Sequence, residues 1–203
     1  MKKMNTETRK EQILNAALEI ASGGINALNI NAIAHRVGLV PSGLYRHFKN
    51  KDQLMDSLLC FAGEKLARHF ESLENRPISD REKLLSMLEH HITFLKENSG
   101  IPQIIFSEEA VLGTPERRKI LLSVIGDYRL RIGSFISRCK EKGLLKEKVS
   151  PEPVAYTMIS LAQTTALFCI LQEEKGHNPE TALEAWRTYC SMIMNEEDRS
   201  DKK

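Results

Sequence analysis

The residues best suited to chemistry in this chain form a short run of hydrogen-bond donors in its N-terminal quarter. Tyr45, Arg46 and His47 are consecutive, and Lys49 and Lys51 follow closely. Hydroxyl, guanidinium, imidazole and ammonium groups donate hydrogen bonds to phosphate oxygens and to base edges. The same residue types also occur on ordinary solvated surfaces, so the run by itself leaves a nucleic-acid site and a solvated face both open.

Two short helices joined at a glycine are predicted to position these donors. Asn29 is a capping residue in front of the helix 30–37, and Gly38 permits a tight turn that a residue with a Cβ resists. A second short helix is expected over residues 41–47. The pattern indicates a helix-turn-helix unit, whose second helix can enter the major groove of DNA.

The first turn of that second helix can be capped in two ways. Val40 precedes it and has no side-chain oxygen to cap free N–H groups. Either Pro41 begins the helix at its first position, or Ser42 supplies the capping oxygen. The sequence leaves these alternatives open.

The stretch around the turn resembles the DNA-binding domain of the TetR family of one-component bacterial regulators. The family pattern I-A-x-x-x-G-V, a small-residue turn, L-Y-x-x-F and x-x-K-x-x-L is met at matching spacing. The matching residues are Ile33-Ala34, Gly38-Leu39, Leu44-Tyr45, Phe48, Lys51 and Leu54. The strong resemblance covers about residues 8–60, and the remainder resembles the family in length and helical pattern.

This resemblance implies a function and an organisation. It implies a homodimer whose paired recognition helices read a palindromic double-stranded DNA operator, and a small-molecule ligand that releases the DNA. The DNA-binding domain is expected over residues 1–50, running into the next helix to about 66, with a ligand-binding and dimerisation domain over 51–203. The family's DNA contacts, transferred to this chain, fall on Asn31, Pro41, Ser42, Gly43, Tyr45, Arg46, His47 and Lys51.

The spacing of apolar residues, together with residues that cap or end helices, predicts an all-α fold of about nine helices. Proline follows a capping residue at Thr114-Pro115, Ser150-Pro151 and Asn178-Pro179, and Ser79 begins a capping box. The helices are expected at about residues 6–22, 30–37, 41–47, 51–73, 80–97, 101–111, 115–142, 151–175 and 179–195.

Charge is unevenly distributed along the 203 residues, and 41% of them are hydrophobic. Residues 1–51 carry eight Lys or Arg against three Asp or Glu, whereas the remainder carries 21 against 24. This asymmetry favours an anionic partner for the N-terminal part. With no secretory signal, a cytoplasmic protein is expected. The uncharged stretch 154–171 includes six polar side chains, which favours a buried helix over a membrane span.

No motif in the sequence indicates an enzyme, a cofactor or a metal. The patterns GxSxG and HExxH, the P-loop and the dinucleotide fingerprint are all absent. His90 and His91 are adjacent, so on a helix they point about 100° apart and do not easily share one ion. His91 is therefore expected to be a pocket or core histidine. The four cysteines lie far apart and are expected to be reduced thiols.

A ligand pocket is expected where aromatic and isolated polar residues share apolar helices. The candidates are His91, Phe94, Phe106, Tyr128, Gln163 and Thr164. Glu108 or Glu109 either meets a cationic ligand or belongs to a solvated acidic edge.

The dimer interface is expected on the last two predicted helices. The helix 151–175 is apolar or neutral on nearly every face, so one face of an isolated subunit would remain in water. Small residues would allow close helix approach. The predicted interface residues are Ala155, Ala162, Ala166, Trp186, Tyr189 and Ile193.

A second function remains open beside the repressor. A TetR-like DNA-binding protein can instead have a non-transcriptional role in nucleoid organisation or division control. An occupancy map of the genome distinguishes a few promoter sites from many dispersed ones.

Overall fold

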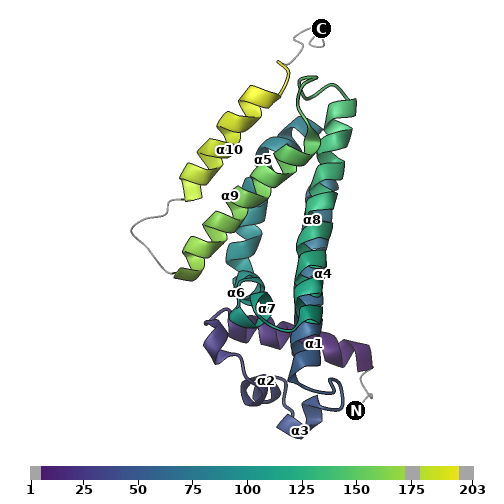
Figure 1. The fold of residues 1–203 in the computed structure, drawn as a ribbon, viewed down its shortest axis with the longest axis vertical. Helices are drawn as coiled ribbons and strands as arrows, with labels where there is room; N and C mark the ends of the chain where they lie inside the picture. The colour runs from purple at the N-terminus through teal and green to yellow at the C-terminus, as the bar shows by residue number, and fades with distance from the viewer. Residues whose placement is uncertain (1–5, 172–178, 197–203) are drawn as a thin grey trace. The chain divides into compact units, whose positions relative to one another are not determined.

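The computed structural model describes residues 6–171 and 179–196, and these residues form α-helices (Figure 1). Within those ranges the one extended pairing is an isolated antiparallel bridge between Leu145 and Met194. The all-α prediction is therefore confirmed. The helices are α1 Thr6–Ala21, α2 Ile30–Arg36, α3 Pro41–Leu44, α4 Lys51–Glu74, α5 Asp80–Glu97, α6 Gly100–Ile105, α7 Glu108–Val111, α8 Pro115–Glu141, α9 Pro151–Leu171 and α10 Pro179–Ile193, with a 3-10 turn η1 at Ile25–Ala27.

The chain divides into two compact units. The first comprises the described residues up to Arg68 together with Phe94–Asp127, and the second comprises His69–Thr93 and the described residues from Tyr128 onward. Three helices, α4, α5 and α8, each contribute residues to both units.

The core of the first unit is formed where α1 meets its neighbours. Ile13 and Ala17 of α1 and Leu58 of α4 are fully buried. At the start of α6, a Cβ built on Gly100 would lie 2.0 Å from the backbone oxygen of Leu18. The backbones of α1 and α6 therefore approach so closely that only glycine fits at this position.

The core of the second unit includes the single tryptophan of the chain. Trp186 of α10 is fully buried, and its Nε1 donates a 3.0 Å hydrogen bond to the backbone oxygen of Leu84 on α5. This bond satisfies the indole N–H, which is costly to bury without a partner. Phe70 meets the rings of Tyr128 and Phe135 edge-on at 6.0 and 6.2 Å between centroids.

Side-chain caps begin the helices that the sequence predicts. The Asn29 side chain accepts a 2.9 Å hydrogen bond from the Ala32 N–H at the start of α2. At α5, the Ser79 N–H donates to Glu82 Oε2 at 2.8 Å, and the Glu82 N–H donates to Ser79 Oγ at 3.2 Å. The predicted capping box is thus confirmed, since each residue satisfies the free N–H of the other.

Three predicted helices differ from the observed ones. The predicted helix 101–111 is divided into α6 and α7. Ser107 has an extended backbone, and its hydroxyl caps a new helix by accepting a hydrogen bond from the Ala110 N–H. The predicted helix 41–47 ends at Leu44, and η1 was not predicted. The predicted helix 151–175 is observed as far as Leu171, and its last four residues lie outside the described residues.

Among the helices of residues 6–171 and 179–196, none is both long and apolar enough to cross a bilayer.

Candidate nucleic-acid interface

The turn between α2 and α3 is built around a left-handed glycine. Gly38 has a φ of 68°, a conformation that residues with a Cβ rarely adopt. After this turn the Leu39 N–H donates a 2.8 Å hydrogen bond to the backbone oxygen of Ala34, which ties the connection back to α2. The helix-turn-helix geometry therefore follows from one glycine and one local hydrogen bond.

Helix α3, the predicted recognition helix, begins with a proline. Val40 is extended, with φ −81° and ψ 152°, and it makes no side-chain capping bond, whereas Pro41 occupies the first turn. Proline suits this place because its missing N–H would have no helical partner there. Of the two alternatives that the sequence left open, the structure has the start through Pro41.

The predicted contact residues lie mostly in solvent. Leu44 and Phe48 are buried and anchor this segment to the core of the unit. The intervening donors are thereby directed outward, and the ring of Tyr45 is half exposed. Asn31, Pro41, Ser42, Tyr45, Arg46 and Lys51 are exposed, and Gly43 and His47 are partly exposed.

His47 has an unusual environment within this face. Its Nδ1 atom is buried and has no hydrogen-bond partner among the described residues. A buried ring nitrogen without a partner is uncommon, and such atoms are often completed by water or by a bound molecule. The residue as a whole is partly exposed, next to the exposed Arg46.

The start of α4 brings Lys51 next to this face. The Asn50 side chain accepts a 2.8 Å hydrogen bond from the Gln53 N–H, while the Gln53 side chain accepts a 2.5 Å bond from the Lys49 N–H. These two bonds hold the start of α4, with Lys51 at its first position. Free N–H groups at a helix start favour an anion such as phosphate.

Lys51 also has a partner that the sequence did not predict. Its Nζ donates to Glu109 Oε1 of α7 at 2.5 Å, across 58 residues of chain. The sequence leaves Glu109 open to a cationic ligand or to a solvated edge, and in the structure the cation beside it is Lys51. No local pattern in the sequence predicts a contact between residues so far apart.

A buried arginine holds the same end of α4. Arg117 of α8 has a side chain that is only 5% exposed. Its Nε donates to Asp56 Oδ1 at 2.8 Å, and its Nη2 donates to Asp52 Oδ1 at 2.7 Å. A desolvated guanidinium that meets two carboxylates is a strong and directional connection. Arg117 was also not singled out from the sequence.

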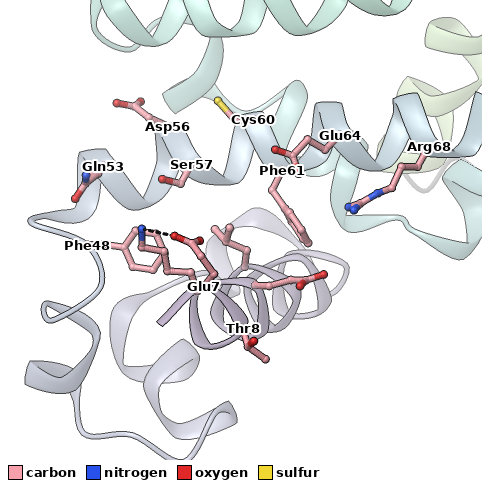
Figure 2. A pocket seen from close by; sticks show the side chains of 13 residues that line it. Glu7, Thr8, Phe48, Gln53, Asp56, Ser57, Cys60, Phe61, Glu64 and Arg68 are labelled. Atoms are coloured by element: carbon pink, nitrogen blue, oxygen red, sulfur yellow. Dashed lines mark hydrogen bonds and ion pairs between the residues drawn. The ribbon is translucent and has the colours of Figure 1, made fainter. Parts of the chain in front are cut away.

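A groove of about 570 Å³ lies between α1 and α4 (Figure 2). Phe48 and Phe61 contribute apolar surface to it, and Lys10 is paired with Glu7 on its α1 side at 3.4 Å. Figure 2 shows the Asp56 carboxylate on the side of α4 away from α1, as its bond to Arg117 requires. The groove combines carboxylates and cations and was not predicted from the sequence.

Two of the predicted ligand residues are in contact inside the second unit. The Tyr128 hydroxyl and His91 Nδ1 form a 2.6 Å hydrogen bond, and both side chains are buried. Burial lowers the pKa of His91 from 6.5 to about 3, with smaller contributions from His69 and His90. Burial also raises the pKa of Tyr128. The pair is therefore neutral at physiological pH.

The other ligand candidates are distributed differently. Phe94 and Phe106 belong to the first unit, and Phe106 is about one-third exposed. Gln163 is partly exposed and Thr164 is exposed on α9. The structure thus brings His91 and Tyr128 together and leaves Gln163 and Thr164 towards solvent.

The neighbouring histidines His69 and His90 stack on each other. The rings of His69 and His90 lie 3.9 Å apart at 14°, and burial lowers the pKa of His69 to about 4. Among the described residues there is no group of three or more His, Cys, Asp or Glu side chains arranged to hold a metal ion. Cys139 and Cys190 are buried thiols whose pKa values burial raises to about 11 and 12.

The predicted dimer residues are mostly buried inside one chain. The side chains of Ala155, Ala162 and Ala166 on α9 and of Trp186 and Ile193 on α10 are at most 7% exposed, and Tyr189 is partly exposed. Buried side chains offer a partner no surface, so an interface on these helices needs their other faces. On α9 that other face has Tyr156, Gln163, Leu167 and Leu171 at helical spacing.

The N-terminal part matches a known family model. Residues 13–58 match the model described as "Bacterial regulatory proteins, tetR family". Among curated proteins, the chain is similar to the nucleoid occlusion factor SlmA of Marinomonas sp. (strain MWYL1), 24% identical over 195 residues, which cover 92% of this chain and 95% of that protein. It is also similar to the fatty acid metabolism regulator protein of Bacillus subtilis (strain 168), 22% identical over 168 residues, covering 81% and 84%.

Solved structures share the fold over nearly the whole chain. A putative TetR-family transcriptional regulator from Rhodococcus sp. aligns with a TM-score of 0.73 at 21% identity, covering 93% of this chain and 100% of that one. The transcriptional regulator FadR from Bacillus subtilis, in complex with stearoyl-CoA, aligns with a TM-score of 0.68 at 17% identity, covering 89% and 96%. At these identities the likeness establishes the fold.

Proposed function

We propose that the protein is a ligand-responsive transcriptional repressor, because residues 13–58 match the model described as "Bacterial regulatory proteins, tetR family". It binds a palindromic operator as a homodimer and is released by a small molecule. The domain 1–50, running into α4, reads DNA, and residues 51–203 hold the ligand and the partner subunit.

The exposed face of α3 is the observation that carries this proposal. Leu44 and Phe48 are buried, so Tyr45 and Arg46 extend into solvent next to Lys51. Tyr45 and Lys51 contact phosphates, while Arg46 and His47 reach base edges or phosphates. Pro41, Ser42 and Gly43 are small or compact, so the backbone approaches the duplex closely, with Asn31 of α2 beside it.

Dimerisation gives the two recognition helices a fixed separation. Successive major grooves on one side of DNA lie about 34–36 Å apart, and two copies of α3 at that spacing read a palindrome. We assign the interface to the exposed, uncharged faces of α9 and α10. These faces include Tyr156, Leu167 and Met192.

A long-chain acyl compound is the ligand class that the relatives favour. One curated relative is a fatty acid metabolism regulator, and one structural neighbour is bound to stearoyl-CoA. His91 and Tyr128 supply a polar pair within the apolar second unit. Stearoyl-CoA is therefore the first probe to test, with free coenzyme A as the control for its polar part.

The test measures binding to DNA from the region upstream of the protein's own gene. Wild type should protect a palindrome in a footprint, and stearoyl-CoA should release it. Tyr45→Phe should weaken binding about three- to tenfold, because it removes one hydroxyl donor per recognition helix. Ser123→Ala also removes one exposed hydroxyl, on α8 and outside the proposed DNA-binding and dimer surfaces, and should leave the affinity unchanged. Equal affinities for both variants would contradict the assignment of Tyr45.

A non-transcriptional role is the second candidate, and one relative favours it. The nucleoid occlusion factor of Marinomonas aligns over 92% of this chain. Mapping the occupied sites across the genome separates the two candidates. A few sites at promoters support the repressor, whereas many dispersed sites without changes in transcription support the nucleoid role.

A further inference from the structure

Lys51 is the predicted phosphate-binding residue with an intramolecular anion already bound. Its ammonium lies 2.5 Å from Glu109 Oε1, with 57% of the lysine side chain and 43% of the glutamate side chain exposed. The pair is therefore open to solvent and accessible to a competing anion. An exposed ammonium–carboxylate pair is weak, so a competing phosphate can displace the carboxylate.

Glu109 is held in place by the structure of α7. The Ser107 Oγ accepts the Ala110 N–H at 3.2 Å and donates to the backbone oxygen of Ile104 at 2.8 Å. Ser107 and Ala110 are both buried. The short helix is thus anchored from beneath, and it presents the Glu109 carboxylate at a fixed place opposite Lys51.

The other carboxylates at this end of α4 are already engaged. Asp52 and Asp56 both accept hydrogen bonds from the buried guanidinium of Arg117. Arg117 therefore neutralises the two aspartates and directs their carboxylates towards itself. Glu109 is then the carboxylate that balances Lys51.

We propose that Glu109 is an intramolecular competitor of the DNA backbone, and that its carboxylate occupies the position at Lys51 that a phosphate takes when DNA binds. This inference rests on the proposed DNA-binding function and adds a regulatory residue to it. Binding exchanges one oxyanion for another at Lys51 and leaves a displaced carboxylate facing a polyanion. Glu109 therefore lowers the affinity for all DNA sequences alike, and a displacement of α7 changes that affinity without altering a base contact.

The experiment uses a mixed-sequence 30-base-pair duplex, because phosphate contacts need no operator. Affinity is measured by fluorescence anisotropy across a series of salt concentrations for wild type, Glu109→Gln and Glu108→Gln. Glu108 is the adjacent exposed residue of α7, so its variant removes the same charge without removing the partner of Lys51. Glu109→Gln should bind about two- to fivefold more tightly than Glu108→Gln. The slope of log affinity against log salt should steepen by up to about 0.9 per subunit.

A double-mutant cycle with Lys51→Ala tests the pairing itself. In the Lys51→Ala background, Glu109→Gln should improve affinity no more than Glu108→Gln does, because the competition no longer exists. Equal affinities of Glu109→Gln and Glu108→Gln in the Lys51 background would overturn the inference alone. A folded wild type that binds no duplex at low salt would overturn the proposed function and this inference with it. Circular dichroism confirms that each variant is folded.

Discussion

His91 is a buried imidazole of the second unit, in contact with the hydroxyl of Tyr128. Because burial disfavours the charged ring, the folded protein keeps it neutral down to about pH 3, whereas an unfolded chain protonates it near pH 6.5. Between these values the unfolded state binds more protons than the folded state. The contribution of His91 to stability is therefore complete above about pH 6.5 and is lost as the pH falls towards 3.

This linkage predicts the pH dependence of unfolding. Between pH 7.5 and pH 5.0, the free energy of unfolding of wild type should decrease, with a slope of up to about 1.4 kcal/mol per pH unit from His91. His91→Gln retains an acceptor for the Tyr128 hydroxyl and should show a smaller decrease. His35→Gln replaces an exposed histidine of α2 and should behave as wild type. Urea titrations at the two pH values measure this, and parallel losses in wild type and His91→Gln would refute it.

At the scale of elements, the contact of α1 with α6 depends on a missing side chain. A Cβ on Gly100 would lie 2.0 Å from the oxygen and 2.8 Å from the carbonyl carbon of Leu18. These are backbone atoms of a packed helix, so neither partner moves without disturbing the core of the first unit. The close separation of α1 and α6 therefore requires that residue 100 have no Cβ.

Gly100→Ala should therefore destabilise the protein, by about 1–3 kcal/mol or more. The matched control is Gly126→Ala in α8, where a new Cβ meets nothing within 4 Å. Since alanine favours a helix over glycine, that control should leave stability unchanged or raise it by up to about 1 kcal/mol. Thermal unfolding compares the two variants. A Gly100→Ala protein that melts with or above the control would show that α1 and α6 separate easily.

At the scale of the whole molecule, α9 presents different residues to its own subunit and to solvent. Ala155, Ala162 and Ala166 pack inward, whereas Tyr156 and Leu167 remain exposed, the latter by 44%. Exposed apolar residues at helical spacing, on a helix whose residues 153–171 carry no charge, are typical of a face that meets another protein. For this chain, a second copy is the partner that the proposed function requires.

Leu167→Glu should produce a folded monomer. A carboxylate at a dimer interface loses its water without gaining a partner, which is costly, while in the monomer it stays in solvent. Light scattering after size-exclusion chromatography measures the mass, and circular dichroism measures the helix content. Ala162→Glu places the same charge inside the subunit and should unfold it instead. If the Leu167→Glu protein stays dimeric, the interface lies on another surface.

Local chemistry in the sequence determined much of this protein. Asn29, Gly38 and Ser79 act within a few residues of themselves, so their caps and turns could be predicted without knowledge of any neighbour. The helix-turn-helix and the exposure of Tyr45 and Arg46 follow from the same short-range patterns. Ser107 is the exception. It caps a new helix and so ends the predicted helix 101–111, although the apolar spacing of the sequence continues past it.

Tertiary structure decided which groups meet across long stretches of chain. Lys51 and Glu109 are 58 residues apart and His91 and Tyr128 are 37 apart, so no local spacing connects them. On α9, neutral residues surround the helix, and periodicity could not show that the alanine face is buried and that Gln163 and Thr164 face solvent. Packing settles such a choice, because only the shape of neighbouring helices distinguishes one neutral face from another.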